Sequence, residues 1–163
     1  MAVTVKDSGY NALVKRVIGM KPVTIRTGIL EKDGAKPHGV DGDDSLTVIQ
    51  IAVWNHFGTT NADGSWRVPP RPFITSWFDA HEGELRKKLV ILMRSVIAGK
   101  RTREEILNLM GQYCVGQIQQ EIADGVPPPN APSTISKKGS STPLVDHGVL
   151  RSSISYDIQE GSK

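Results

Sequence analysis

The chain has 163 residues, of which 38% are hydrophobic and 23% are charged. This length suits one domain with a hydrophobic core and is too short for two ordinary domains. The 20 basic residues are interleaved with 17 acidic ones, so the net charge of +3 permits binding to nucleic acid without indicating it. No apolar run reaches the roughly 18 residues of a membrane span, and the first residues lack a signal-peptide core, so we expect a cytoplasmic product.

The first predicted elements are a short helix and a strand. Apolar residues recur at intervals of three and four near the N-terminus, at Tyr10, Leu13, Val14, Val17 and Ile18. This spacing predicts a helix with one face toward a core, ending at Gly19. Val23, Ile25 and Thr27 then alternate with polar residues, which predicts a strand over residues 23–30, with Arg26 facing solvent or a partner.

The next segment is predicted to be a loop followed by a helix. Residues 31–44 are rich in glycine and acidic residues, which predicts an exposed loop. The apolar spacing of residues 45–57 fits a helix, while their β-branched residues favour a strand. We predict the helix, with Asp44 or Ser45 as its N-cap and Gly58 in the left-handed position at its end.

The most informative segment lies between residues 55 and 73. It reads Asn55-His56-Phe57-Gly58-Thr59, then a polar loop, then Val68-Pro69-Pro70-Arg71-Pro72-Phe73. Proline fixes its own backbone angle φ and restricts the preceding residue, so the three prolines around Arg71 predict a stiff, extended segment. Two roles are open for it: an arm that contacts a neighbouring subunit, or a lead-in to a helix with Phe73 and Trp77 in the core.

Two long helices are predicted after this segment. Apolar residues follow one helical face over residues 74–96, which predicts a helix that ends near Gly99. Thr102 and Glu105 then have the spacing of a capping box, and the apolar stripe continues over residues 106–122. The two segments therefore predict a helical hairpin.

Two glycines and the single cysteine lie in the second of these helices. Gly111 and Gly116 each lower helix propensity by roughly 1 kcal/mol relative to alanine, so we expect either the close approach of another backbone or a tolerated weak point. Cys114 has no partner for an internal disulfide and lies among apolar residues. We therefore predict a buried, unreactive thiol.

The last part of the chain combines a linker with an ordered end. Residues 125–142 are rich in proline, serine and lysine, which predicts a linker without a core of its own, mobile or ordered on assembly. Order returns at residues 143–150, where Asp146 can cap a short helical turn. Strict alternation over residues 154–158 predicts a final strand.

Together these elements predict an α+β fold in a single domain over residues 1–163. A small antiparallel sheet is expected to pack against the long two-helix hairpin, with extended loops and the proline-rich linker outside. The core is expected to come from about residues 8–124 and 143–159.

Candidates for catalysis and for metal or nucleotide binding are weak. Asp146, His147 and the nearby serines lack the nucleophile elbow and the oxyanion motif of a serine hydrolase. The histidines are scattered without ligand spacing, and the glycines of residues 34–42 lack the lysine of a phosphate-binding loop. The basic clusters lack interleaved aromatic residues, which indicates solvated helix faces. We therefore predict no enzyme, no cofactor and no metal site.

The order of the motifs resembles a known family of phage proteins. The chain has an Asn-x-Phe-Gly-Thr segment, a Pro-x-Arg-Pro-Phe segment, two amphipathic helices and a proline-rich linker. Residues 143–156 then follow the pattern Pro-Leu-Val-Asp-x-Gly-x-Leu-x-x-Ser-Ile-x-Tyr. These pieces, over residues 46–158, resemble the tail-completion and neck proteins of tailed bacteriophages, typified by the HK97 gp10-like family. His56 and His147 depart from the family pattern, which commonly has an acidic residue and a small hydroxyl residue there.

The resemblance implies a structural virion protein of the head–tail junction, made in the host bacterial cytoplasm. Its copies form a ring that joins the portal or connector to the tail tube or terminator, and DNA passes through without sequence-specific binding. The resemblance implies no reaction and no membrane partner. Two alternatives are open: a tail-terminator ring protein that caps the tail tube, and a DNA-binding accessory protein whose binding depends steeply on salt.

The matched motifs define a predicted assembly interface. Proline limits the freedom of an unbound arm, so docking on a neighbour costs less entropy. Arg71 can make a forked bond to a carboxylate or carbonyl group across the joint. The residues predicted to form the interface are Asn55, Phe57, Gly58, Thr59, Pro69, Pro70, Arg71, Pro72, Phe73, Asp146, Gly148 and Leu150.

Overall fold

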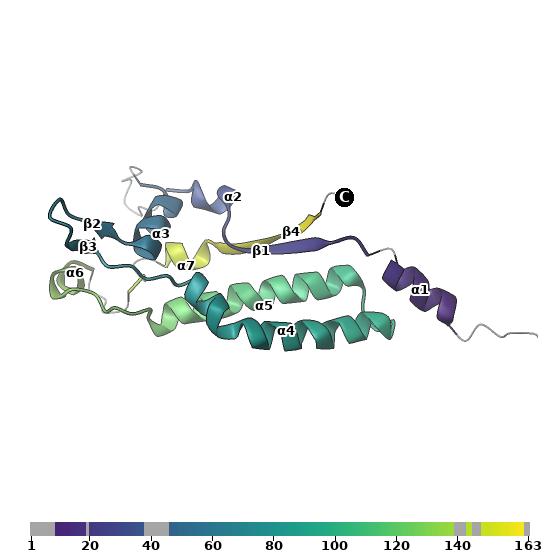
Figure 1. Ribbon diagram of the computed structural model, residues 1–163. Coiled ribbons are helices and arrows are strands. Elements are labelled where there is room, and N and C mark those ends of the chain that lie inside the picture. The colour runs from purple at the N-terminus through teal and green to yellow at the C-terminus, as the bar shows by residue number, and fades with distance from the viewer. Residues whose placement is uncertain (1–8, 19, 38–45, 139–142, 145–147, 162–163) are drawn as a thin grey trace, which may run out of the picture.

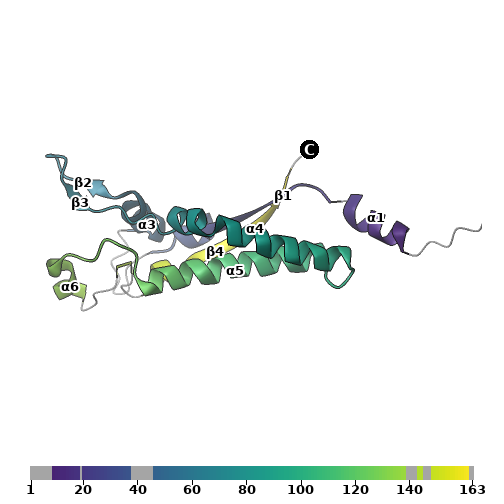
Figure 2. The same cartoon turned by 60° about the horizontal axis from the view of Figure 1, so that its bottom comes forward.

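The computed structural model describes residues 9–18, 20–37, 46–138, 143–144 and 148–161. Within them the chain has a mixed α+β fold, with two long helices in contact and two small antiparallel sheets of two strands each. The predicted fold class is therefore confirmed. The molecule is elongated, with the first helix at one end and the smaller sheet at the other (Figures 1 and 2).

The predicted hairpin consists of helix α4, Thr75–Ile97, and helix α5, Arg103–Asp124. Its second helix begins with the predicted capping box. Thr102 Oγ1 accepts a hydrogen bond from the Glu105 N–H at 3.1 Å, and the Glu105 carboxylate accepts one from the Thr102 N–H at 2.6 Å. These two bonds satisfy amides that the first turn of a helix leaves without partners.

The larger sheet pairs strand β1, Val23–Ile29, with strand β4, Ile154–Glu160. Both strands agree with the sequence predictions and run antiparallel. Arg26 is exposed, as expected, and its Nε donates to an Asp157 oxygen on β4 at 2.9 Å. The sheet packs mainly on α5 (Figure 1), so it covers one helix of the hairpin rather than both.

A glycine allows the sheet to approach α5 closely. A Cβ atom added at Gly111 would lie 2.2 Å from the ring of Tyr156 on β4. The close neighbour of this glycine is therefore an aromatic ring and not the predicted backbone. Tyr156 Oη donates to Asn108 Oδ1 at 2.8 Å, which holds the ring in place. A Cβ at Gly116 would meet nothing within 4 Å, so this second glycine is the tolerated weak point.

The core gathers residues from most of the chain. Its buried members are Val48, Ala52, Phe73, Trp77, Cys114, Ile118, Ile122, Val126, Leu144, Leu150 and Ile154. Burial raises the pKa of the Cys114 thiol, in agreement with the predicted unreactive cysteine. Val126 and Leu144 flank the proline-rich segment, so both sides of that segment are anchored in the core.

Helix α3, Val48–Phe57, confirms the helical interpretation of its segment. The N-cap is Thr47, however, and neither Asp44 nor Ser45. Thr47 Oγ1 accepts from the Gln50 N–H at 3.4 Å, and the Gln50 side chain accepts from the Thr47 N–H at 2.8 Å. This second capping box starts the helix later than predicted, because both orphan amides are satisfied from Thr47 onward.

The predicted exposed loop over residues 31–44 is wrong in its first part. Glu31–Gly34 forms a short helix, α2, in which Gly34 is buried against Ile49 of α3. So short a helix has little stability of its own. It forms because it packs on α3, which its polar composition does not disclose. Residues 38–45 lie outside the described part of the chain.

The smaller sheet does not appear among the sequence predictions. Strand β2, Thr59–Thr60, pairs with strand β3, Trp66–Val68. The connecting turn contains Asp63 and Gly64, and Gly64 has φ 82. An Asp-Gly pair is a strong hairpin signal, so this sheet was open to prediction. It projects from the body at the end opposite the first helix (Figure 1).

Two short helices lie near the C-terminus. The first, α6, Pro132–Lys138, falls inside the predicted linker. Proline is common at the first position of a helix, because the N–H at that position would have no acceptor within the helix and its absence costs nothing. The second, α7, Val149–Ser152, follows Gly148, which has a left-handed backbone at φ 75. The predicted cap of this turn, Asp146, lies outside the described residues.

Helix α1, Tyr10–Ile18, forms as predicted, but its apolar face is not in the core. Tyr10 and Val17 are exposed. Arg16 Nη1 donates to the Ile97 carbonyl at 3.2 Å, at the C-terminal end of α4. The prediction of a buried face is wrong, since Leu13 and Val14 are only half-buried, because α1 lies beyond the end of the larger sheet and mainly contacts α4 (Figure 2).

Candidate assembly interface

Several residues of the predicted interface gather around α3. The Arg71 N–H donates to the Asn55 carbonyl at 2.7 Å. Asn55, Pro69, Arg71 and Leu150 line one cleft of about 440 Å³, between α3, the segment before α4 and the segment after α5. Parts of the chain that are far apart in sequence but belong to the same motif series therefore form one structural unit.

Arg71 is the buried polar centre of this unit, with 5% of its surface exposed. Its Nε donates to the Pro128 carbonyl at 2.8 Å, and its Nη2 donates to the Pro129 carbonyl at 3.2 Å. Burial lowers the pKa of the guanidinium, although arginine titrates so far above neutrality that it keeps its charge. The forked bond expected across a subunit joint is made within the chain in this structure.

The residues after Arg71 lead the chain into α4. Phe73 is buried, and its ring meets the His56 ring edge-on, with 5.4 Å between centroids. Trp77, one helical turn later, is buried as well. Of the two roles left open for the proline segment, the structure contains the helix lead-in, with both aromatic residues in the core.

Gly58 and Thr59 turn the chain from α3 into the smaller sheet. Gly58 has φ 76, and a Cβ atom there would lie 2.8 Å from both the Val68 carbonyl oxygen and the Trp66 ring. Thr59 pairs with Val68 across the sheet. Backbone conformation and space both require glycine at this position. The glycine of the Asn-x-Phe-Gly-Thr motif thus holds the smaller sheet against the end of α3.

His56 lies at the junction of α3 and α4. Its Nε2 is 3.3 Å from Thr75 Oγ1, and its ring also contacts Phe57 and Phe73 edge-on. Desolvation lowers the pKa of this imidazole below its ordinary value of 6.5. The side chain is therefore neutral at neutral pH and forms part of the packing between the two helices.

Phe57 differs from its neighbours in the predicted interface, because it is 68% exposed. Ile49 and Val53 precede it at intervals of four residues and are 40% and 43% exposed. Such spacing places all three side chains on one face of the helix; we call them the α3 stripe. The stripe borders a hollow of about 220 Å³ that Ile29 and Ile74 also line. Nowhere does α3 contain Asp, Glu, Lys or Arg.

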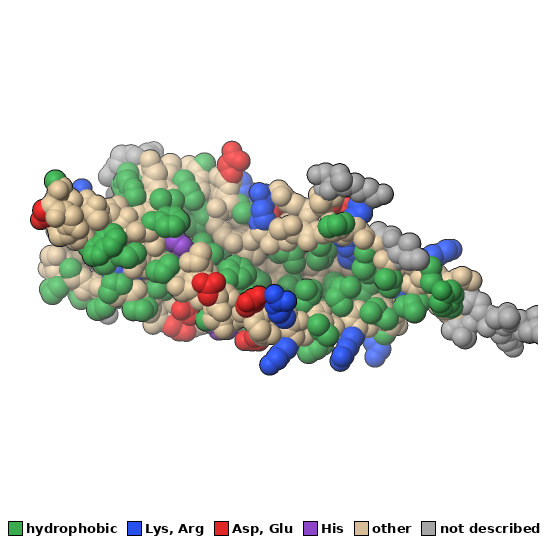
Figure 3. Space-filling model, in the orientation of Figure 1, with side chains coloured by type: hydrophobic (Ala, Val, Ile, Leu, Met, Phe, Trp, Pro, Cys, Tyr) green, Lys and Arg blue, Asp and Glu red, His purple; other side chains and the backbone are tan. Residues whose placement is uncertain are grey.

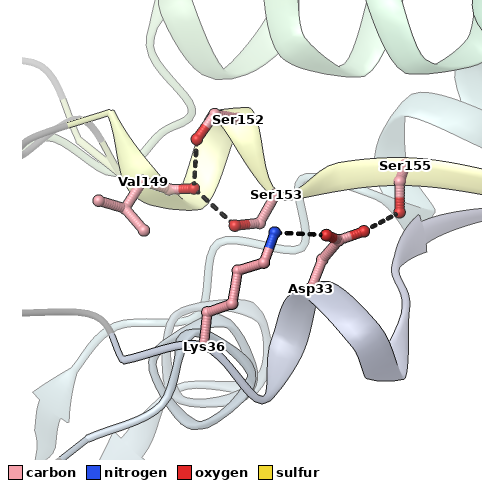
Figure 4. A network of polar contacts seen from close by, with 6 residues as sticks. All are labelled: Asp33, Lys36, Val149, Ser152, Ser153 and Ser155. Atoms are coloured by element: carbon pink, nitrogen blue, oxygen red, sulfur yellow. Dashed lines mark hydrogen bonds and ion pairs between the residues drawn. The ribbon is translucent and has the colours of Figure 1, made fainter. Parts of the chain in front are cut away.

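The C-terminal part of the predicted interface forms the corner between α7 and β4. Leu150 is buried in the core, and Gly148 supplies the left-handed turn before it. The hydroxyl groups of Ser153 and Ser152 both donate to the Val149 carbonyl, at 2.8 and 3.0 Å (Figure 4). These bonds fix the short helix directly before the strand.

Asp33 ties the same corner to α2. It accepts a hydrogen bond from Ser155 Oγ at 2.7 Å and pairs with Lys36 Nζ at 2.7 Å (Figure 4). The bond from Lys36, and then the bond from Ser155, lower the pKa of this carboxyl group. The ionised form is the one these partners stabilise, so the link persists at neutral pH.

The described residues offer packing and apolar surface rather than converging reactive groups. No three of their His, Cys, Asp or Glu side chains lie close enough together to hold a metal ion. Asp146 and His147, the pair weighed for a hydrolase triad, lie outside the described ranges. None of the helices in those ranges is long and apolar enough to cross a membrane.

A second apolar surface, absent from the sequence predictions, lies between β1 and the hairpin. It is a groove of about 410 Å³, and its lining includes Val23, Ile25, Leu85, Leu89 and Met93. We call it the β1–α4 groove. Strands lie about 5 Å apart and a helix is about 10 Å across, so two strands cover only one helix of a pair. The apolar spacing of α4 identifies the helix face that lines this groove. The sequence does not indicate that the sheet is too narrow to cover that face.

Comparison of the chain with protein families, with curated proteins and with solved structures gave no match in any of the three.

Proposed function

We propose that this chain is a structural subunit of the head–tail junction of a tailed bacteriophage. In this proposal its copies form a ring that joins the portal or connector to the tail, and DNA passes through the ring without sequence-specific binding. The subunit catalyses no reaction and binds no cofactor. Its place is the virion, after synthesis in the bacterial cytoplasm.

The exposed α3 stripe is the observation that carries this proposal. Exposed apolar patches mark contact sites on proteins, and the centre of an interface is typically poor in charge and rich in aromatic residues. The α3 stripe has both properties, since Phe57 is its most exposed member and the whole helix is uncharged. The surface therefore suits lasting contact with another protein subunit.

The motif residues packed beneath the α3 stripe also support the proposal. Arg71 and Gly58 hold the two ends of the segment that follows α3, through bonds to the linker and through contact with β3. His56 and Phe73 fill the space between α3 and α4. In this arrangement Arg71, Gly58 and Phe73 position the α3 stripe, and Phe57 is the motif residue that belongs to the stripe itself.

The test is a joining experiment with purified parts. Full-length chain is added separately to connector-bearing heads and to tails, and the bound particles are counted by electron microscopy. We expect binding to connectors, and joined particles once tails are added. Phe57→Asp should reduce joining strongly, whereas Ile135→Asp, at an exposed position of α6, should not. Binding to tube ends alone would replace the proposal with the tail-terminator alternative.

A titration with duplex DNA tests the other alternative. A DNA-binding accessory protein would lose affinity steeply as salt rises, by about 0.9 logarithmic units per released phosphate contact for each tenfold increase in salt. We expect weak binding with no preference among sequences, measured by fluorescence anisotropy. Tight binding with a steep salt slope would favour the accessory protein.

A further inference from the structure

We propose that the α3 stripe of one copy of this chain occupies the β1–α4 groove of the next copy. This head-to-tail contact would be the joint between neighbouring subunits of the ring. The inference rests on the proposed function, because it takes a second copy of the chain as the occupant of the groove. It names two surfaces, one of which contains no residue of the matched motifs.

The groove is an apolar surface that lacks a cover among the described residues. Strand β1 pairs with β4 along one edge, its other edge has no strand beside it among the described residues, and Val23, Ile25 and Thr27 on one of its faces line the groove. Beside that edge lies the apolar face of α4, where Leu89 is 40% exposed although it belongs to the same stripe as buried residues. A further layer over this face would complete the packing that the sheet provides for α5.

The two apolar surfaces lie apart on one side of the molecule. Figure 3 shows hydrophobic side chains gathered over α3 and again between β1 and α4. One surface is the exposed face of a helix beside a small hollow and the other is a larger groove, so the two surfaces are unlike. Contacts between unlike surfaces of identical chains are heterologous, and they close into rings when the rotation between copies permits.

The charges of α4 favour this pairing. Its first half carries Asp79, Glu82 and Glu84, and its second half carries Arg86, Lys87, Lys88 and Arg94. Glu82 and Arg86 pair with each other at 2.7 Å, and Glu84 accepts a hydrogen bond from Tyr113. The first turn borders the α3 stripe, since Thr75 lines the same hollow, while the groove runs along α4 from Phe78 and Leu85 to Leu89 and Met93. Docking the stripe at the Leu89–Met93 end of a neighbour's groove brings the acidic half of one α4 toward the basic half of the next. Such complementarity guides partners and fixes their register.

The far rim of the groove favours α3 over α1, another helix with exposed apolar residues. Lys21 and Arg103 lie at this rim and share one carboxylate, Glu160, at 3.8 and 3.6 Å, so positive charge is in excess. Helix α1 of a neighbour would bring Lys15 and Arg16 and no acidic residue. Like charges would then oppose its docking, whereas the uncharged α3 meets no such repulsion.

The test disables one surface at a time in the full chain. Val53→Asp places a charge in the α3 stripe, and Leu89→Asp places one in the groove. Each variant alone should self-associate about thirtyfold more weakly than the unmodified chain, the loss typical of a central interface residue. A mixture of the two should form a heterodimer and stop there, because one intact stripe and one intact groove remain. Sedimentation velocity distinguishes these species.

Control variants keep the test decisive. Ile91→Asp, at an exposed position of α4 outside the groove, should leave self-association unchanged. Circular dichroism checks that every variant is folded. The proposal is overturned if the unmodified chain stays monomeric, if the mixture yields no heterodimer, or if Ile91→Asp weakens association as much as Leu89→Asp. It is also overturned if Val17→Asp, on α1, abolishes association while Val53→Asp does not.

Failure of this contact and failure of the proposed function give different results. If heads and tails are joined by the unmodified chain but the mixed variants form no heterodimer, the contact is wrong and the function stands. If the heterodimer forms but the chain joins no particles, the contact stands and the function is wrong.

Discussion

The two helices of the hairpin are nearly equal in length but differ in what covers them. Helix α5 lies under the larger sheet and buries Ile106, Met110, Gly111, Cys114, Ile118 and Ile122. Helix α4 buries Trp77 and Val96, and its face toward β1 lines an open groove. Both have apolar stripes of the same spacing. An apolar stripe therefore identifies the contact face of a helix without telling whether its partner belongs to the same chain.

The largest effect should come from truncating equivalent apolar side chains on the two helices. Ile118 of α5 is fully buried, so Ile118→Ala should lower the free energy of unfolding by about 2–5 kcal/mol. Leu89 of α4 keeps much of its surface exposed, and Leu89→Ala should cost only about 1 kcal/mol. Urea denaturation of the monomeric chain measures both. Equal losses would mean that the two helices are covered alike.

Arg71 tests how the two helices are held together at the end of the hairpin where α4 begins and α5 ends. Arg71→Met removes two bonds and leaves the carbonyl groups of Pro128 and Pro129 without this partner, which should cost about 2–3 kcal/mol. Arg71→Lys keeps the charge but cannot span both carbonyl groups, so its stability should lie between those of the unmodified chain and Arg71→Met. Limited proteolysis should then cut the linker faster. An unchanged monomer would indicate that Arg71 acts between subunits instead.

The glycines of α5 give a pair of opposite predictions. Gly111→Ala forces a methyl group into the Tyr156 ring and should destabilise the fold by about 1–3 kcal/mol. Gly116→Ala enters open space and gains helix propensity, so it should stabilise by up to about 1 kcal/mol. Thermal unfolding of both variants decides. The same sign at both positions would contradict the tight packing of the sheet on α5.

The smallest effect should be a pH dependence caused by His56, near the end of α3. Burial lowers the folded-state pKa of His56 below 6.5, so the unfolded chain binds a proton more readily than the folded one. His56 therefore contributes stability above about pH 6.5 that is lost as the pH falls through that value. Urea midpoints measured from about pH 8 down to about pH 5 should decline, and His56→Phe should flatten the decline. An equal decline in the variant would assign it to other groups.

Local signals predicted most of the elements. The capping box at Thr102 and Glu105 and the alternation of the two long strands are readable without tertiary structure. The Thr47–Gln50 box and the Asp63–Gly64 turn have local sequence signals of the same kind, although neither is among the predictions. The formation of helix α2 and the exposure of α1 could not be predicted from local sequence, because both depend on which surfaces pack beside these helices.

The motif order groups residues that also lie close together in the structure, but it does not predict which of them face inward. The motif order suggests a common location, and the structure brings Asn55, Arg71 and Leu150 to one cleft. Whether a residue of a stiff segment faces inward depends on distant parts of the chain, and Arg71 is buried by a linker far along it. The β1–α4 groove depends on the number of strands in a sheet, which apolar spacing does not encode.

The bonds of Arg71 also close a loop that contains the whole hairpin, since Arg71 and Pro128 are 57 residues apart. The entropic cost of closing a loop grows slowly with its length. Here the packing of α4 against α5 already brings the two ends of the loop together, so the Arg71 bonds add little further entropic cost. The two hydrogen bonds of Arg71 link the ends of this loop as a disulfide would, but they form without an oxidant. The chain has one cysteine, which cannot make an internal cross-link.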